Sequence, residues 1–123
     1  MGTNDVIADA CGPDQVAAGI LSIVEQLRIR RPDAWIVVQS LLPSKKAEPF
    51  VVNSINEATK CLTDSTRKMF FFNSSNVFMS SSDAVDADLF FEDGVHPNVE
   101  GSEQWARAMV DFLRMLYSNR YYL

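Results

Sequence analysis

Apolar residues recur at helical spacing in three stretches of the chain, residues 13–30, 48–66 and 98–117. Positions three and four apart share one face of a helix, so each stretch predicts an amphipathic helix with one buried side. Pro13 and Pro49 stand near the starts of the first two stretches, where a missing backbone N–H costs no hydrogen bond. The apolar faces consist of Val16, Ile20, Ile23, Val24 and Leu27, then Val51, Ile55, Ala58 and Leu62, and finally Trp105, Met109, Phe112, Leu113 and Leu116.

Two shorter stretches are apolar nearly throughout and show no helical period. Residues 34–43 read A-W-I-V-V-Q-S-L-L-P, and residues 68–73 read K-M-F-F-F-N. Runs of β-branched and aromatic residues are typical of strands that are covered on both faces. The Ser- and Asp-rich segment 73–92 is predicted to be a surface loop with at most one helical turn. Strands that alternate with helices predict right-handed crossovers and a parallel sheet, so the fold class is α/β.

The predicted sheet has too few strands for the size of the chain. With 123 residues the chain is long enough for one domain, residues 1–123, and it shows no repeat or linker. The strand over residues 34–42 is of the central kind and needs a neighbour on each side. The opening Gly2-Thr3-Asn4-Asp5 is a turn sequence of the kind that follows a strand. We therefore expect the second half of an α/β domain, with an incomplete parallel sheet.

Composition and charge narrow the possible partners only a little. Hydrophobic residues make up 47% and charged residues 22% of the chain, as in ordinary globular domains. The net charge of -5 argues against nucleic acid or an anionic membrane as the main partner. No apolar run approaches the roughly 20 residues of a transmembrane helix. No targeting signal is visible, so the sequence indicates no cellular location.

Metal and cofactor chemistry finds no support in the sequence. A single histidine and scattered carboxylates do not form a ligand set, and no phosphate-binding loop is present, so we expect neither a metal nor a cofactor. Cys11 and Cys61 lack metal spacing and are too few for a disulfide framework. Two buried or half-buried thiols are the simpler interpretation, and a single disulfide between them stays open.

His96, the only histidine, stands in the segment E-D-G-V-H-P-N, three residues after Asp93. A carboxylate at this distance can accept a hydrogen bond from one imidazole nitrogen and leave the other free as a general base. A surface histidine beside a turn aspartate would produce the same short pattern. The pair therefore indicates catalysis only when other residues point the same way.

The two ends of the chain together carry a more specific signal. The turn G-T-N-D near the start and the segment D-G-V-H-P-N before the last helix resemble the paired motifs of the SGNH, or GDSL, hydrolases. The stretch V-H-P-N-V-E-G-S-E-Q-W-A is similar to the acetylhydrolase-type esterases of that family, and I-V-V-Q-S-L-L-P resembles the matching strand. The resemblance covers essentially the whole chain. It implies the C-terminal half of a flavodoxin-like, three-layer α/β/α domain with strand order 2-1-3-4-5, of which only the last two strands would be present.

The resemblance also implies a role for each motif residue. Asn4 would direct its side-chain amide into the oxyanion hole, and Gly2 and Asp5 would support the turn that holds it. His96 would be the general base that activates a serine, and Asp93 would orient the imidazole. The implied activity is the hydrolysis of an acyl ester, with the substrate class left open.

The chain departs from the family at the nucleophile. The family carries its serine in a Gly-Asp-Ser motif after the first strand, and this sequence contains no G-D-S. That motif, and a glycine of the oxyanion hole, would stand before the G-T-N-D turn. Ser40, Ser74 and Ser75 stand in or directly after the two predicted strands. None is on a glycine-rich turn, so we expect ordinary strand-end serines.

Two functions from different classes remain open. The first is an ester hydrolase whose nucleophile half is supplied from elsewhere, so that this chain is inactive alone. The second is a non-catalytic subunit of a larger assembly. Both predict a protein partner or self-association that covers the exposed edge of the sheet, because an unpaired strand edge invites pairing.

Overall fold

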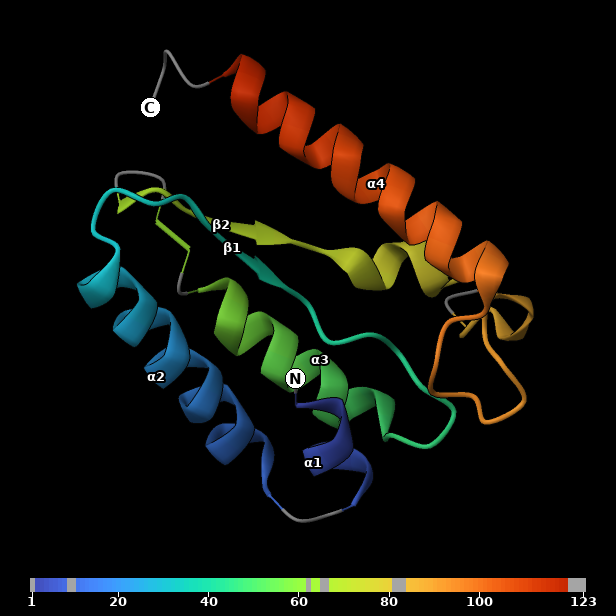
Figure 1. Cartoon of the computed structure of the whole chain (residues 1–123). Coiled ribbons are helices and arrows are strands. Elements are labelled where there is room, and N and C mark those ends of the chain that lie inside the picture. Colours follow the sequence, from blue (N-terminus) through green and yellow to red (C-terminus); the bar gives the residue numbers. More distant parts are fainter. Residues whose placement is uncertain (1, 9–10, 62, 65–66, 81–83, 120–123) are drawn as a thin grey trace.

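The computed structural model describes residues 2–8, 11–61, 63–64, 67–80 and 84–119. Helices and strands alternate along these residues and stack into layers (Figure 1). In chain order the elements are α1 (Thr3–Ile7), α2 (Pro13–Arg30), β1 (Ile36–Gln39), α3 (Pro49–Lys60), β2 (Met69–Phe72), the 3-10 helices η2 (Ser74–Phe78) and η3 (Ala87–Leu89), and α4 (Val99–Ser118).

The two strands lie side by side and parallel, with Ile36 opposite Met69 and Gln39 opposite Phe72. Helices α2 and α3 lie on one side of this sheet and α4 lies on the other (Figure 1). The strands are connected through α3, because parallel neighbours need a crossover connection. The predicted α/β class with an incomplete parallel sheet is thereby confirmed.

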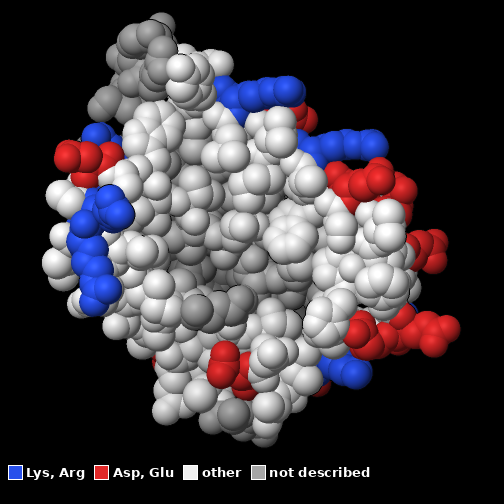
Figure 2. Space-filling model, in the orientation of Figure 1, with Lys and Arg blue, Asp and Glu red and all other residues white. Residues whose placement is uncertain are grey.

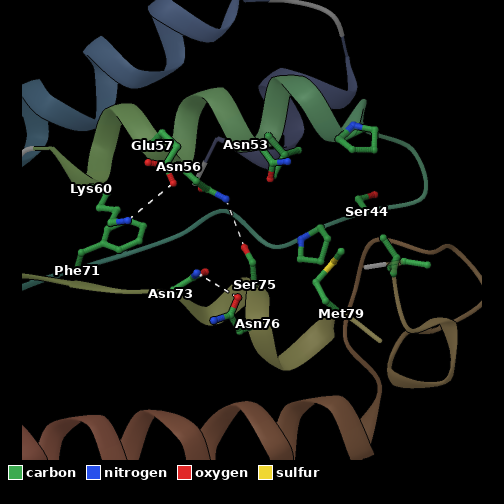
Figure 3. A pocket seen from close by; sticks show the side chains of 16 residues that line it. Ser44, Asn53, Asn56, Glu57, Lys60, Phe71, Asn73, Ser75, Asn76 and Met79 are labelled. Carbon is green, nitrogen blue, oxygen red and sulfur yellow. Dashed lines mark hydrogen bonds and ion pairs between the residues drawn. The ribbon is translucent and has the colours of Figure 1, made fainter. Parts of the chain in front are cut away.

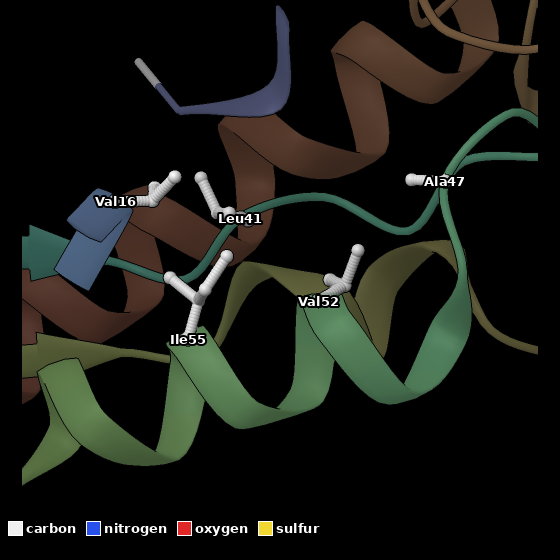
Figure 4. Packing of buried hydrophobic residues seen from close by; sticks show 5 residues of the cluster. All are labelled: Val16, Leu41, Ala47, Val52 and Ile55. Carbon is white, nitrogen blue, oxygen red and sulfur yellow. The ribbon is translucent and has the colours of Figure 1, made fainter. Parts of the chain in front are cut away.

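Buried apolar side chains hold the layers together in three groups. One group joins α2, α3 and the segment after β1 (Figure 4), a second joins α2 to the sheet, and a third lies next to α4. Their buried members are Val16, Leu41, Ala47, Val52 and Ile55 in the first, Val24, Ile36, Val38 and Met69 in the second, and Phe78, Leu89 and Phe90 in the third.

The strands are shorter than the sequence predicts. The apolar run over residues 34–43 becomes strand only at Ile36–Gln39, because beyond Ser40 the backbone bonds to a side chain of α3 and no longer to β2. The run over residues 68–73 becomes strand at Met69–Phe72. It starts after Lys68, whose φ of 56° belongs to the left-handed region and not to a strand.

The helices also differ from the predicted ranges. The helix predicted over residues 48–66 ends at Lys60, and the predicted loop 73–92 contains η2 and η3. The opening G-T-N-D, predicted as a turn, instead begins the short helix α1 after Gly2. The buried face of α3 holds Val52 and Ile55 together with Asn56 and Thr59, whereas Ala58 of the predicted face is exposed. Leu62 lies outside the described residues.

Arg28 closes the end of α2 by bonding to carbonyl groups of two separate segments. Its Nη1 donates to the carbonyl oxygens of Pro32 and Ala34, at 2.8 and 2.9 Å, and to that of Arg31. Its Nη2 donates to the carbonyl oxygens of Arg67 and Lys68. One guanidinium therefore joins the approach to β1 with the approach to β2, and the fork of its N–H groups suits this role better than an ammonium would.

We expect Arg28→Ala to loosen the start of the sheet. The loss of several charge-assisted hydrogen bonds should make the Ile36 amide proton, which bonds to the carbonyl oxygen of Lys68 at 2.9 Å, exchange with solvent roughly tenfold faster. Amide hydrogen exchange measures this change. Arg30→Ala is the matched control, because the side chain of Arg30 is exposed and bonds to no other described residue. Equal Ile36 exchange in both variants would contradict the bridging role.

The edge of β1 that faces away from β2 has no strand partner among the described residues. The amide of Ile36 bonds to Lys68, directly before β2, and that of Ser40 bonds to Phe72 of β2. Strand geometry turns the backbone groups of Val37 and Gln39 to the other edge. We call this the open edge. Two residues of the predicted apolar face of α2, Ile23 and Leu27, are 40% and 47% exposed. Figure 2 shows a hollowed face whose middle carries no Lys, Arg, Asp or Glu.

We expect the chain on its own to be marginally stable or to self-associate. A sheet of two strands offers little core, and the open edge and exposed apolar residues favour pairing with another chain. Sedimentation velocity should show oligomers, or calorimetry should show a broad transition of low enthalpy. A monomer that melts in one sharp cooperative transition would contradict this expectation.

Candidate active site

Asp93 forms a tight turn in the segment between η3 and α4. Its Oδ1 accepts hydrogen bonds from the backbone amides of Val95, at 2.8 Å, and His96, at 3.0 Å. Gly94 adopts a φ of 65°, which favours glycine, and its amide donates to the carbonyl oxygen of Phe91 at 2.9 Å. The four residues from Asp93 to His96 therefore hold one another in place before α4 begins.

The same turn brings together the side chains of Asp93 and His96, whose contact the sequence predicts. Nδ1 of His96 lies 2.6 Å from Oδ2 of Asp93, and the two side chains are 73% and 40% exposed. An ionised carboxylate can only accept, so Nδ1 carries the proton and donates it. Nε2 of His96 makes no hydrogen bond with any described residue. A general base with an orienting carboxylate requires this geometry, in which Asp93 holds one imidazole nitrogen and the other is open.

Hydrogen bonds hold the pKa of the Asp93 carboxyl well below its usual value of 3.8. The backbone amide of His96 contributes most, followed by the His96 side chain and then the backbone amide of Val95. All three donate to the charged form of the carboxyl and so favour it. Asp93 therefore stays ionised at neutral pH and can accept the hydrogen bond from Nδ1 of His96.

The segment after β1 fixes the position of this turn. Oγ of Ser44 donates to the carbonyl oxygen of Gly94 at 3.1 Å, and the backbone amide of Lys45 donates to the same oxygen at 3.2 Å. A Cβ on Gly94 would lie 3.1 Å from Cβ of Lys45, so a side chain there would crowd the contact. Neither Gly94 nor Ser44 is among the site residues predicted from the sequence. The Asp-Gly pair at residues 93–94 is a turn signal that could have indicated Gly94, whereas no sequence motif indicates Ser44.

Gly2, Asn4 and Asp5 lie at the start of the chain on or next to α1. Gly2 is buried with a φ of 97°, and a Cβ there would lie 2.9 Å from Cδ2 of Leu41, so both conformation and space require glycine. Asn4 and Asp5 are exposed, and their side chains bond to no other described residue. The structure brings Asp93 and His96 together, but it forms no hydrogen bond between Asn4 and either of them.

The three candidate serines have other partners. Ser40 and Ser74 are 5% and 0% exposed, and their hydroxyl oxygens lie 3.0 Å apart. Oγ of Ser75 donates to the carbonyl oxygen of Leu41 at 2.7 Å and lies 3.0 Å from Oγ of Ser40. None bonds to His96. Their hydroxyl groups satisfy the end of β1, as expected for strand-end serines.

Other candidate chemistry is sparse in the part of the chain that the structure describes. No three His, Cys, Asp or Glu side chains gather there in a group that could hold a metal ion. Cys11 and Cys61 are both free thiols, Cys11 half-buried and Cys61 exposed. Within the same residues, no helix combines the length and the apolar character needed to cross a bilayer.

We expect an acid titration to separate the contributions to the Asp93 carboxyl. Because its pKa in the folded chain lies below the usual 3.8, the turn gains stability that is present above that value and lost as the pH falls through the folded pKa. In His96→Ala the backbone amides remain, so the Asp93 pKa should rise only part of the way. Carboxyl carbon NMR shifts measure both midpoints. An Asp93 midpoint at 3.8 in the unsubstituted chain would contradict the turn geometry.

Comparison with known proteins places the fold. No protein-family model and no curated protein matches this sequence. Among solved structures, a carbohydrate esterase family 3 protein from Talaromyces cellulolyticus matches with a TM-score of 0.75 and 20% identity, over 97% of this chain and 56% of its own. A Bacteroides fragilis protein described as an acylhydrolase matches with a TM-score of 0.74 and 22% identity, over 92% and 58%.

A third similar solved structure is a domain of a retrotransposon protein. The esterase domain of the ORF1 protein from the zebrafish ZfL2-1 retrotransposon matches with a TM-score of 0.67 and 25% identity, over 92% of this chain and 64% of its own. The chain thus spans 56–64% of the length of these three proteins. All three are of the SGNH type, as the G-T-N-D and D-G-V-H-P-N motifs suggest. The chain therefore has the α/β fold of part of an SGNH-type hydrolase domain.

Proposed function

We propose that this chain supplies the base-bearing half of a serine ester hydrolase. The observation that carries the proposal is the 2.6 Å contact between Asp93 and His96, which leaves Nε2 of His96 open. The fold of part of an SGNH-type hydrolase domain supports it, because in that fold the sequence motifs imply a base and its orienting carboxylate at these positions.

The proposed reaction gives each residue one step. Nε2 of His96 takes the proton from a serine hydroxyl as its oxygen forms a bond to the ester carbonyl carbon. Asp93 stabilises the imidazolium that results, and the Asn4 amide donates to the oxyanion of the tetrahedral intermediate. His96 then gives the proton to the leaving alcohol. Water, activated by the same imidazole, releases the acid and restores the serine.

The serine in this proposal comes from a polypeptide segment that carries a Gly-Asp-Ser motif. Ser40, Ser74 and Ser75 are occupied at the end of β1, and no hydroxyl of the residues that the structure describes bonds to His96. The open edge of β1 is where a strand from that segment would pair. The chain by itself would then contain neither a complete oxyanion hole nor a nucleophile. We propose that it is inactive alone.

A non-catalytic interaction subunit is the second candidate function. It is favoured by the open edge, by the exposed apolar side chains of α2, and by the absence of G-D-S from the sequence. In that case the contact between Asp93 and His96 only shapes the turn before α4. The two candidates agree on a protein partner and differ on whether Nε2 of His96 receives a proton.

A fluorophosphonate probe tests the first candidate, because it labels only an activated serine. The isolated chain should show no mass shift and no p-nitrophenyl acetate hydrolysis, and His96→Ala should change neither. In the assembly purified from its source, the label should appear on a serine outside these 123 residues. There His96→Ala should lower kcat by about a hundredfold or more, as expected for the loss of a general base.

Glu92→Ala is the matched control, since Glu92 is exposed in the same segment and bonds to no other described residue. It should leave kcat unchanged in the assembly. Labelling of Ser40, Ser74 or Ser75 in the isolated chain would overturn the account of the nucleophile. Activity in the assembly that is insensitive to His96→Ala would overturn the catalytic role and favour the interaction subunit.

A further inference from the structure

A recess of about 680 Å³ opens between α3 and two further stretches of chain, residues 71–79 and 84–85 (Figure 3). Ser44 from the segment after β1 closes one side of it. Neither Asp93 nor His96 lines the recess, so it is separate from the proposed base. Its volume lies in the range of cavities that hold small ligands.

Four carboxamides, Asn53, Asn56, Asn73 and Asn76, make up half of the polar residues that line the recess. Asn56 is fully used, since its Oδ1 accepts from the Leu41 amide at 2.6 Å and its Nδ2 donates to the Leu41 carbonyl at 3.1 Å. Nδ2 of Asn73 donates to Oδ1 of Asn76 at 3.1 Å. The side chain of Asn53 bonds to no other described residue, so donors and acceptors of three carboxamides remain available.

The charge of the recess is close to zero. Its charged lining residues are Glu57 and Lys60, which lie 4.0 Å apart with side chains 74% and 58% exposed. They stand near solvent and offset each other. A recess for an anion would be expected to offer an arginine or a second lysine, and one for a cation a cluster of carboxylates. The charges therefore favour a neutral ligand.

Apolar side chains complete the lining. Phe71, Met79 and Val85 add hydrocarbon surface next to the carboxamides, and Figure 3 shows Phe71 and Met79 near opposite ends of the recess. A matching ligand has groups that both donate and accept hydrogen bonds, with C–H surface between them. Sugar hydroxyls on a pyranose ring have this alternation, whereas a lipid chain would leave the carboxamides without partners.

We propose that the recess binds a neutral saccharide of two or three rings. Asn53, together with the unused groups of Asn73 and Asn76, bonds to the hydroxyls, and Met79 and Val85 pack against the ring. The proposal rests on the recess alone and does not depend on ester hydrolysis. Loss of esterase activity would leave it standing, and loss of saccharide binding would leave the proposed base unaffected.

NMR titration of the ¹⁵N-labelled chain tests the proposal, in the form in which the chain is isolated, alone or with a polypeptide that completes it. The probes are cellobiose, xylobiose and mannobiose. At least one should shift the side-chain amide signals of Asn53 and Asn76 in a saturable way. The double variant Asn53→Ala with Asn76→Ala should bind it about tenfold more weakly, because hydrogen bonds to the hydroxyls are lost.

The design separates binding from folding. Both substituted side chains are exposed, and alanine favours helix at position 53, so the variant should keep the far-ultraviolet circular dichroism of the parent. Gln26→Ala is the matched control, because it removes an exposed carboxamide on α2 that bonds to no other described residue. Asn53→Ala alone should show an intermediate affinity.

Three outcomes would overturn the proposal. The first is that none of the three disaccharides shifts these signals. The second is that the double variant and Gln26→Ala bind with equal affinity. The third is that galacturonate or a neutral peptide shifts the Asn53 and Asn76 signals more strongly than any neutral disaccharide, which would mean that the recess selects another chemistry.

Discussion

The backbone of Leu41 must find hydrogen-bond partners where β1 leaves the sheet, and most of the structure depends on how it does so. A buried peptide group without a partner would cost more than an ordinary hydrogen bond contributes. The Asn56 side chain bonds to both the amide and the carbonyl of Leu41, and Ser75 donates to the same carbonyl. The Leu41 side chain meanwhile packs in the first apolar group and against Gly2. One residue thus joins α1, α2, α3 and the end of the sheet.

The proposed base depends on this junction through a short series of contacts. The chain runs from Leu41 to Ser44, whose hydroxyl and whose neighbour's amide hold the carbonyl of Gly94. Gly94 lies inside the turn that Asp93 forms with the amides of Val95 and His96. The orientation of the imidazole is therefore local, whereas its place relative to the sheet comes from the segment after β1.

Polar side chains of α3 and of the carboxyl ends of the strands fall into two groups with different consequences. Ser40, Ser74 and Asn56 are buried and bond to one another or to backbone, so they contribute to the fold and offer nothing to a ligand. Asn53 and Asn76 keep unused donors or acceptors at the wall of the recess. Residues of the same chemical type thus divide between structure and recognition according to whether the protein already satisfies them.

The sequence alone determined the features that rest on contacts between near neighbours. Helices α2 and α4 follow from periodic apolar residues, β1 and β2 from apolar runs, and the contact of Asp93 with His96 from a spacing of three residues. Only the tertiary structure decided where the strands end, that Gly2 begins a helix, and that Ser44 holds Gly94. The end of β1 and the position of Gly94 depend on residues 15 and 50 positions apart, Asn56 with Leu41 and Ser44 with Gly94. Local spacing carries no information about such pairs, because they meet only once the helices have packed on the sheet.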